Sequence, residues 1–230
     1  MKFASAIIVA AGKGSRMQSD IPKQFLTLDG RTVLFHTMSQ FLKADGVSEI
    51  ILVIAPEYLD SQWINKSLPA SAGKPVRIVA GGTTRQQSVQ NGLAAIDHKS
   101  EIVLTHDGVR LLIQPDTINA AIEKCMAHDG VIVAIPATDT LKKVAGTQIL
   151  ETIDRKTVWQ MQTPQVFKRE VLEQAFLYAD KQGFAGTDEA SLVEQISADL
   201  QVLPGRKSNI KITVKEDLAI AKAIMENYAN

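Results

Sequence analysis

A loop of small residues and cations near the start of the chain has the composition of a phosphate-binding loop. Its small residues are Ala10, Ala11, Gly12 and Gly14. Glycine lets backbone N–H groups approach phosphate oxygens closely, and the cations Lys13, Arg16 and Lys23, which suit a polyphosphate, follow in the same stretch. The loop is neither a Walker A motif nor a complete dinucleotide fingerprint, because Met17 stands where a third glycine would be. An ordinary glycine turn beside a solvated basic loop therefore stays open as the alternative.

Two later segments contain groups that could complete a nucleotide site. Asp107 and Arg110 follow an apolar run, and a carboxylate at a strand end can hold Mg²⁺ or a ribose hydroxyl. Gly82 and Ser88 lie in a stretch that could begin a helix, and a helix N-terminus can read a base or bind an anion. Taken alone, the first segment is equally explained by a capped turn in which Arg110 pairs with Asp107 on the surface, and the second is better explained by an ordinary helix N-cap.

Composition removes several other classes of protein. The 230 residues contain 25 Lys and Arg against 25 Asp and Glu, so the formal net charge is zero. Overall charge therefore gives no reason to expect a general nucleic-acid binder or a membrane-surface protein. Cys125 is the single cysteine, which excludes an intramolecular disulfide and a cysteine zinc cluster. The apolar run 6–11 is too short to span a membrane and lacks the form of a secretory signal. We therefore expect a cytoplasmic protein.

The elements that must position these groups follow an alternating pattern of apolar runs and amphipathic stretches. Continuous β-branched runs predict buried strands at 6–10, 50–54, 76–79, 101–104 and 131–135. Helical spacing predicts helices at about 33–42, 89–96, 118–126, 168–181 and 188–197. This order indicates a Rossmann-like, doubly wound α/β fold with a mostly parallel sheet and helices on both faces. A last strand at 209–212 and a closing helix behind a capping box at 213–216 complete the prediction.

The segment 137–158 interrupts this rhythm. Two short strand-like runs flank Ala145-Gly146-Thr147, which predicts a β-hairpin. A hairpin inserted in a wound sheet has edges to cover, so it could be a lid or a dimerisation arm. We predict one domain over residues 1–230 with an inserted β-arm at about 137–158.

The motifs of the chain, taken in order, resemble those of sugar-phosphate nucleotidyltransferases. The loop 10–17 followed by Pro22-Lys23-Gln24 carries the general resemblance. The narrower resemblance rests on an ordered set of motifs: Gly81-Gly82 with Arg85 and Ser88, His106-Asp107 with Arg110, Asp139-Thr140, Asp154-Arg155, Gln162-Thr163-Pro164-Gln165, Thr187-Asp188-Glu189-Ala190 and Asn209-Ile210-Lys211. Over residues 6 to about 225 the chain is similar to the 2-C-methyl-D-erythritol 4-phosphate cytidylyltransferase family of non-mevalonate isoprenoid synthesis.

The resemblance implies a reaction and a role for each matching residue. CTP and methylerythritol 4-phosphate would give 4-diphosphocytidyl-methylerythritol and pyrophosphate, with Mg²⁺, by in-line attack of the substrate phosphate on the α-phosphorus. The implied catalytic residues are Arg16, Lys23 and Lys211. The implied nucleotide-binding residues are Ala10, Ala11, Gly12, Gly14, Gly82, Ser88 and Asp107, with Asp107 also facing the metal. The implied residues for the methylerythritol substrate are Arg110, Thr140, Arg155, Thr163 and Thr187.

The resemblance also implies a homodimer in which the arm crosses to the partner, so that Thr140 and Arg155 complete the partner's site. Ser15 departs from the pattern where some members carry a second arginine, which leaves Lys13 as the cation that could take its place. A ribitol-5-phosphate cytidylyltransferase is the nearest alternative, although 187–190 looks more like the methylerythritol enzymes. A non-catalytic nucleotide-binding module is a second alternative, disfavoured because Arg16, Lys23 and Asp107 occur together.

Overall fold

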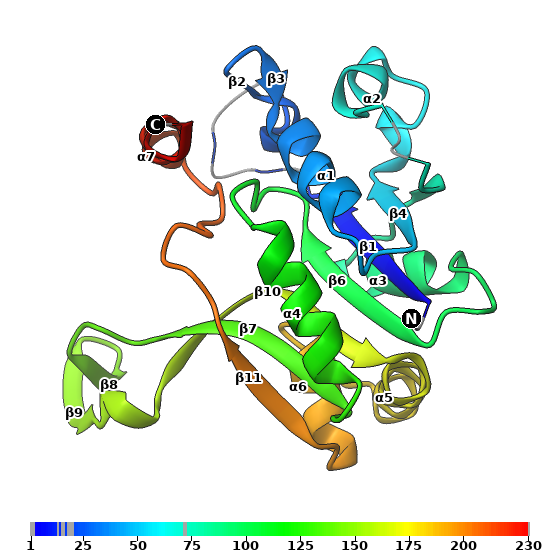
Figure 1. The fold of residues 1–230 in the computed structure, drawn as a ribbon. Helices are drawn as coiled ribbons and strands as arrows, with labels where there is room; N and C mark the ends of the chain where they lie inside the picture. The colour runs from blue at the N-terminus through cyan, green and yellow to red at the C-terminus, as the bar shows by residue number, and fades with distance from the viewer. Residues whose placement is uncertain (1–2, 13, 15–16, 18–20, 71–72, 230) are drawn as a thin grey trace.

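The computed structural model describes residues 3–12, 14, 17, 21–70 and 73–229 and shows a central β-sheet with helices on both faces (Figure 1). Among these residues the sheet has seven strands in the order β11-β7-β10-β6-β1-β4-β5. Their bounds are β1 Ala4–Ala10, β4 Glu49–Ile54, β5 Val76–Ala80, β6 Ile102–Asp107, β7 Gly130–Pro136, β10 Trp159–Lys168 and β11 Leu200–Pro204. Strand β10 runs antiparallel to β6 and β7, and the other neighbouring pairs are parallel. The predicted α/β fold with a mostly parallel sheet is confirmed.

Strand β1, which lies between β6 and β4, contributes to the core on both sides of the sheet, because successive side chains of a strand point to opposite faces. Ile8 packs with one hydrophobic cluster and Ile7 with the other, and both side chains are fully buried. This explains why the strand reads as a continuous apolar run rather than an alternating one.

Helices cover the two faces of the sheet in separate groups. Helices α1 (Val33–Lys43) and α4 (Pro115–Cys125) pack in the first cluster. Helices α3 (Arg85–Ala94), α5 (Arg169–Gln182) and α6 (Glu189–Val193) pack in the second. The short α2 (Gln62–Ser67) and the strand pair β2 (Thr27–Leu28) and β3 (Arg31–Thr32) flank α1. Helix α7 (Lys215–Ala229) packs through Ala221 on a third cluster that includes Val109 and Ile212.

Two predictions at the C-terminal end are wrong. Residues 209–212 are not a strand, and a backbone hydrogen bond from Ile212 N–H to Val109 O (3.0 Å) joins this segment to the third cluster. The apolar side chain of Ile212 is buried in that cluster, which explains the strand-like pattern. The start of α7 also differs from the predicted capping box, because Asp217 accepts hydrogen bonds from the N–H groups of Thr213 and Val214.

Strands β10 and β11 are additional to the predicted elements. The middle of β10 reads Gln162-Thr163-Pro164-Gln165, with a shift of register between Met161 and Gln165. A polar segment containing proline does not have the pattern of a central strand. It is nevertheless buried, because its side chains bond to neighbouring segments rather than to solvent.

The predicted hairpin is present, as β8 (Leu141–Ala145) and β9 (Gln148–Ile153), and it projects from the body of the molecule (Figure 1). Its base is closed by a hydrogen bond from Ala137 N–H to Val158 O (3.0 Å). Within the described residues the two strands pair only with each other. Val144, Ile149 and Leu150 are 53, 63 and 52% exposed. That the chain forms one domain with an inserted arm stays a prediction.

Candidate active site

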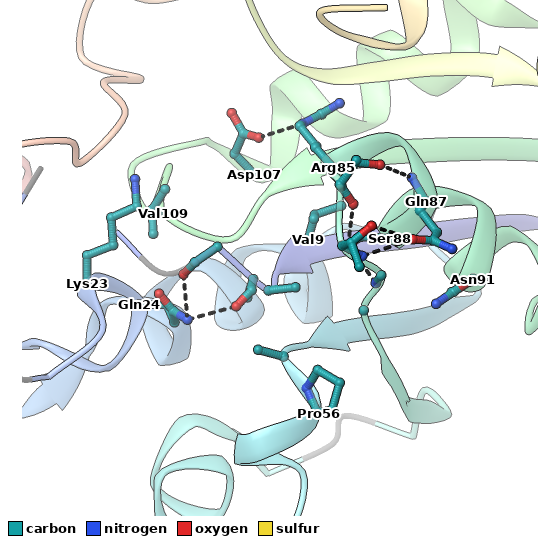
Figure 2. A pocket seen from close by; sticks show the side chains of 18 of the residues that line it. Val9, Lys23, Gln24, Pro56, Arg85, Gln87, Ser88, Asn91, Asp107 and Val109 are labelled. Atoms are coloured by element: carbon teal, nitrogen blue, oxygen red, sulfur yellow. Dashed lines mark hydrogen bonds and ion pairs between the residues drawn. The ribbon is translucent and has the colours of Figure 1, made fainter. Parts of the chain in front are cut away.

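A cavity of about 720 Å³ opens at the carboxyl ends of β1, β4, β5 and β6, which is where open α/β sheets bind ligands. Figure 2 shows Lys23 and Gln24 on one side of it and Arg85, Gln87 and Ser88 on the other. The predicted site residues that line the cavity are Ala10, Ala11, Gly12, Lys23, Gly82, Ser88, Asp107 and Lys211. Residues from four distant parts of the sequence therefore meet in one place.

The glycine-containing loop is held by the side chain of Gln24, which is 1% exposed. Its Nε2 donates to Ala10 O (2.8 Å) and Gly12 O (3.3 Å), so the loop's carbonyls are turned towards the amide. Gly14 has φ +64°, and a Cβ there would lie 3.2 Å from Lys23 Cγ. Glycine therefore suits this position on two grounds: the left-handed backbone and the close approach of Lys23.

Lys23 belongs to a short 3₁₀ turn, Lys23–Phe25, that follows Pro22. Its Nζ donates to Ile212 O (3.0 Å), which ties the loop to the C-terminal segment. Lys13, Ser15 and Arg16 lie outside the described residues, so the predictions made for Lys13 and Arg16 stay predictions.

The turn before α3 presents its backbone to the cavity. Ser88 Oγ donates to Thr84 O (2.9 Å) and accepts from Gly82 N–H (3.1 Å), so this hydroxyl fixes the turn from inside the helix. Gln87 Oε1 accepts from Thr83 N–H (2.9 Å) and reinforces the same turn. The predicted helix N-terminus at this place is confirmed by α3.

Asp107, at the end of β6, lies among three cationic side chains of the described part of the chain. Its Oδ2 is 2.9 Å from Lys211 Nζ and 3.4 Å from Arg110 Nε, and its Oδ1 is 3.5 Å from Arg85 Nε. Burial alone would raise the pKa of Asp107, but the three cations, Lys211 above all, outweigh it and hold the pKa well below its usual range. Asp107 is therefore a carboxylate that holds positive charge at the edge of the cavity.

Arg85 extends this cluster to a second carboxylate. Its Nη1 is 2.6 Å from Glu189 Oε1, at the start of α6. Burial alone would lower the pKa of Arg85, but Glu189 and Asp107 outweigh it and raise the pKa above its usual value. Arg85 and Glu189 lie in motifs that carried the family resemblance, but residue type alone assigned them no role. The cluster has three cations and two carboxylates, which leaves it with net positive charge facing the cavity.

Behind Asp107, His106 and Thr163 form a buried polar pair. Thr163 Oγ1 accepts from Asp107 N–H (3.1 Å) and lies 2.9 Å from His106 Nδ1, and His106 Nε2 lies 3.2 Å from Arg110 O. Because a carbonyl can only accept, His106 carries its proton on Nε2, and the Thr163 hydroxyl donates to Nδ1. Burial lowers the pKa of His106 to about 3, which agrees with a neutral ring. Thr163 thus supports Asp107 from behind rather than lining the cavity.

The other predicted substrate residues lie apart from the cavity lining. Arg110 also donates from Nη1 to Asn209 O (2.9 Å) and stands beside Asp107. Thr140 and Arg155 are exposed on the arm, where Arg155 Nη1 donates to Thr138 O (2.6 Å). Thr187 is exposed just before α6. The structure does not bring Thr140, Arg155 or Thr187 into the cavity of their own chain.

The residues around Asp107 do not fit it as a Mg²⁺ ligand. Both of its oxygens face ammonium or guanidinium nitrogens, which is the environment of an ion pair. In the part of the chain that the structure describes, no group of three or more His, Cys, Asp or Glu side chains is placed to hold a metal ion. Asp107 is therefore suited to an ion pair and not to a metal ligand.

A Rossmann-like sheet whose carboxyl edge carries a glycine loop, a helix-initiating turn and a cationic cluster defines an α/β nucleotidyltransferase. The profile of one family, 2-C-methyl-D-erythritol 4-phosphate cytidylyltransferase, matches residues 4–227. The chain belongs to this family.

Curated relatives and solved structures agree with that assignment. The enzyme named 2-C-methyl-D-erythritol 4-phosphate cytidylyltransferase in Syntrophus aciditrophicus is 40% identical over 222 residues, which cover 96% of this chain and 95% of the relative. The protein of that name in Acidobacterium capsulatum is 44% identical over 225 residues, 94% of each chain. The crystal structure of 4-diphosphocytidyl-2C-methyl-D-erythritol synthase from Anaerococcus prevotii superposes with a TM-score of 0.86 at 34% identity, covering 98% of this chain and 99% of that one.

Proposed function

We propose that this protein transfers CMP from CTP to 2-C-methyl-D-erythritol 4-phosphate and releases pyrophosphate, as a step of isoprenoid precursor synthesis. The observation that carries this proposal is the family match over residues 4–227. The cavity supports it independently, because a glycine loop and two lysines converge on one space at the strand ends.

The reaction needs no covalent enzyme intermediate. An oxygen of the acceptor's phosphate attacks the α-phosphorus of CTP, the bond from the α-phosphorus to the β-phosphate oxygen breaks, and pyrophosphate leaves with that electron pair. Lys23 and Lys211 would stabilise the charge that grows on the α-phosphate and on the leaving group, together with Arg16. The remainder of the rate enhancement would come from holding the two phosphates in line.

The nucleotide would lie along the glycine loop and the turn before α3. Backbone groups of Ala10, Ala11, Gly12 and Gly82 would contact the cytidine, and Ser88 would keep the turn in shape through its two hydrogen bonds. Asp107 would face the ribose side of the nucleotide. Its ion pairs would hold Lys211 and Arg110 in their places beside the reacting phosphates.

The acceptor would bind beside Asp107, near Arg110 and Thr187, and Thr163 would support Asp107 from behind. In this proposal the protein is a homodimer, and Thr140 and Arg155 of the partner subunit close the acceptor site by arm exchange. The exposed apolar side chains of the arm support this idea, because an isolated two-stranded hairpin is marginally stable in water. Mg²⁺ would accompany CTP on its phosphate oxygens.

The test is pyrophosphate release with CTP and Mg²⁺, with methylerythritol 4-phosphate and ribitol 5-phosphate compared in parallel. Strong preference for methylerythritol 4-phosphate is the expected result. Preference for ribitol 5-phosphate would keep the chemistry and replace the acceptor. A folded protein that binds CTP but releases no pyrophosphate with either acceptor would overturn the enzymatic proposal.

A further inference from the structure

Arg85 spans two carboxylates from different elements, Asp107 at the end of β6 and Glu189 at the start of α6. Its Nε is 3.5 Å from Asp107 Oδ1 and its Nη1 is 2.6 Å from Glu189 Oε1. The side chain is 29% exposed and lines the cavity, and Figure 2 shows it beside Asp107 at the rim. An arginine suits such a bridge because its planar fork offers donors in fixed directions, which a lysine does not.

The carboxylate of Glu189 is buried and has a partner on each oxygen. Its side chain is 1% exposed, and a carboxylate buried to this degree requires partners. Glu189 Oε1 accepts a hydrogen bond from Arg85 Nη1, and Glu189 Oε2 accepts one from Thr105 Oγ1 (2.7 Å) on β6. The carboxylate is thus fixed between β6 and α3, two residues beyond Thr187.

The first turn of α3 is also hydrogen-bonded, through the side chain of Gln86, to the segment that precedes Thr187. Gln86 Oε1 accepts from Gly186 N–H (3.2 Å), and Gln86 Nε2 lies 3.5 Å from Phe184 O. The same turn supports Gly82 through Ser88 on its other side. One helix start therefore touches both the proposed nucleotide subsite and the segment proposed for the acceptor.

We infer that Arg85 and Glu189 are a positioning pair that couples the nucleotide cavity to the acceptor side of the site. Arg85 orients Asp107 from one direction while Lys211 and Arg110 hold it from the other, and Glu189 keeps the guanidinium from swinging into the cavity. Neither residue exchanges a bond with a substrate. This inference rests on the proposed function, since it assigns the acceptor to the side of Thr187.

The test is a double-mutant cycle with steady-state kinetics for both substrates. Arg85→Gln and Glu189→Gln are each expected to lower kcat/KM for the acceptor about tenfold or more, with KM for CTP changed less than about threefold. The double variant should lose no more than the worse single variant, because each substitution already breaks the same bridge. Arg85→Lys should recover only part of the loss, since one ammonium cannot span both carboxylates.

The half-buried pair Arg169 and Glu173, 2.7 Å apart on α5, supplies the matched control. Glu173→Gln removes an arginine-bound carboxylate far from the cavity and should leave both KM values unchanged. If Glu189→Gln fails to fold, Thr105→Val removes only the hydrogen bond behind Glu189 and should reproduce the acceptor-selective loss.

Several results would overturn the inference alone: additive losses in the double variant, a loss of CTP affinity equal to the loss for the acceptor, or full activity in Arg85→Lys. A wild-type protein that is inactive with both polyol phosphates would instead overturn the proposed function, and the coupling role with it.

Discussion

His106 and Asp107 are neighbours in the chain, yet the fold gives them opposite electrical environments. Asp107 faces three cations and keeps its charge, whereas His106 is fully buried against Phe41 and stays neutral. The neutral ring is useful, because Thr163 can then donate to Nδ1 and still accept from Asp107 N–H. One strand end therefore supplies a charged group to the cavity and an uncharged group that supports it.

The buried histidine makes stability depend on pH in a specific window. The pKa of His106 is about 3 in the folded protein and about 6.5 in an unfolded chain. Between these values the unfolded state binds one more proton, so the free energy of unfolding falls as pH falls, by about 1.4 kcal/mol per unit. Asp107, with its lowered pKa, adds stability that is lost only below about pH 4.

Urea unfolding of wild type and His106→Gln at pH 7 and pH 5 checks this expectation. Wild type should lose about 2 kcal/mol more than the variant between the two pH values, because the variant cannot take up the proton on unfolding. Equal losses in the two proteins would contradict a neutral buried ring at His106.

Lys23 is the residue whose removal should separate catalysis from folding. Lys23→Ala should lower turnover by roughly 10²–10³-fold, the usual effect of removing one group that stabilises transition-state charge. Because Lys23 lies in a short 3₁₀ turn and not in the core, the melting temperature should change little. Turnover is measured by pyrophosphate release, with Lys99→Ala, an exposed lysine at the other end of the sheet, as the control. Turnover within threefold of wild type would refute the role.

At the scale of elements, the predictable parts are those whose side chains face a uniform environment. Strands β1, β4 and β7 are buried along nearly their whole length, so they read as unbroken apolar runs. The hairpin was recognisable from its glycine turn. Strand β10 could not be recognised, because its buried centre is polar and its partners are distant in sequence: Gln165, for example, bonds to Asp188 and to Ala190 N–H.

The same distinction applies to the candidate site. The glycine loop and the turn before α3 are local features, and their composition predicted them. Gln24, Arg85 and Glu189 act through partners on other elements, such as the 104 residues that separate Arg85 from Glu189. Nothing in the residue types themselves indicates those pairings. Only the motif resemblance pointed to them, without a physical role.

The arm is an element whose exposed apolar surface calls for a partner. Ile149→Lys should convert the proposed dimer to a monomer, because it places a charge in the surface that the partner would cover. Light scattering coupled to size exclusion measures the change. Leu177→Lys is a matched control, since Leu177 on α5 is 61% exposed and Ile149 is 63% exposed. A dimer that survives Ile149→Lys, or one that Leu177→Lys also dissolves, would argue against the arm as the interface.

At the scale of the whole molecule, the site gathers residues from both ends of the chain. The cavity lies at one edge of the sheet, and the arm leaves the sheet between β7 and β10. The arm residues Thr140 and Arg155 do not line the cavity of their own chain. A site completed by a second copy is the arrangement that the proposed dimer requires.

Among the described residues no helix is long and apolar enough to cross a membrane.

Mixing two inactive variants tests a shared site directly. In a heterodimer of Lys23→Ala and Arg155→Ala subunits, one of the two sites keeps both groups, so turnover should return to roughly half of wild type. The measurement is pyrophosphate release by heterodimers purified through two different affinity tags. Each homodimer of a single variant is the control. No recovery in verified heterodimers would place both residues in the same chain's site.

The ties from the cavity to the segment 209–212 have a consequence for how the protein is made. Arg110 bonds to Asn209 O, Lys23 bonds to Ile212 O, and Lys211 pairs with Asp107. A ribosome delivers this segment only after all seven sheet strands, the last of which ends at Pro204. Until this segment docks on the sheet, the cavity lacks a cation and two carbonyl anchors. Docking of these few residues would have to precede the first productive binding of CTP.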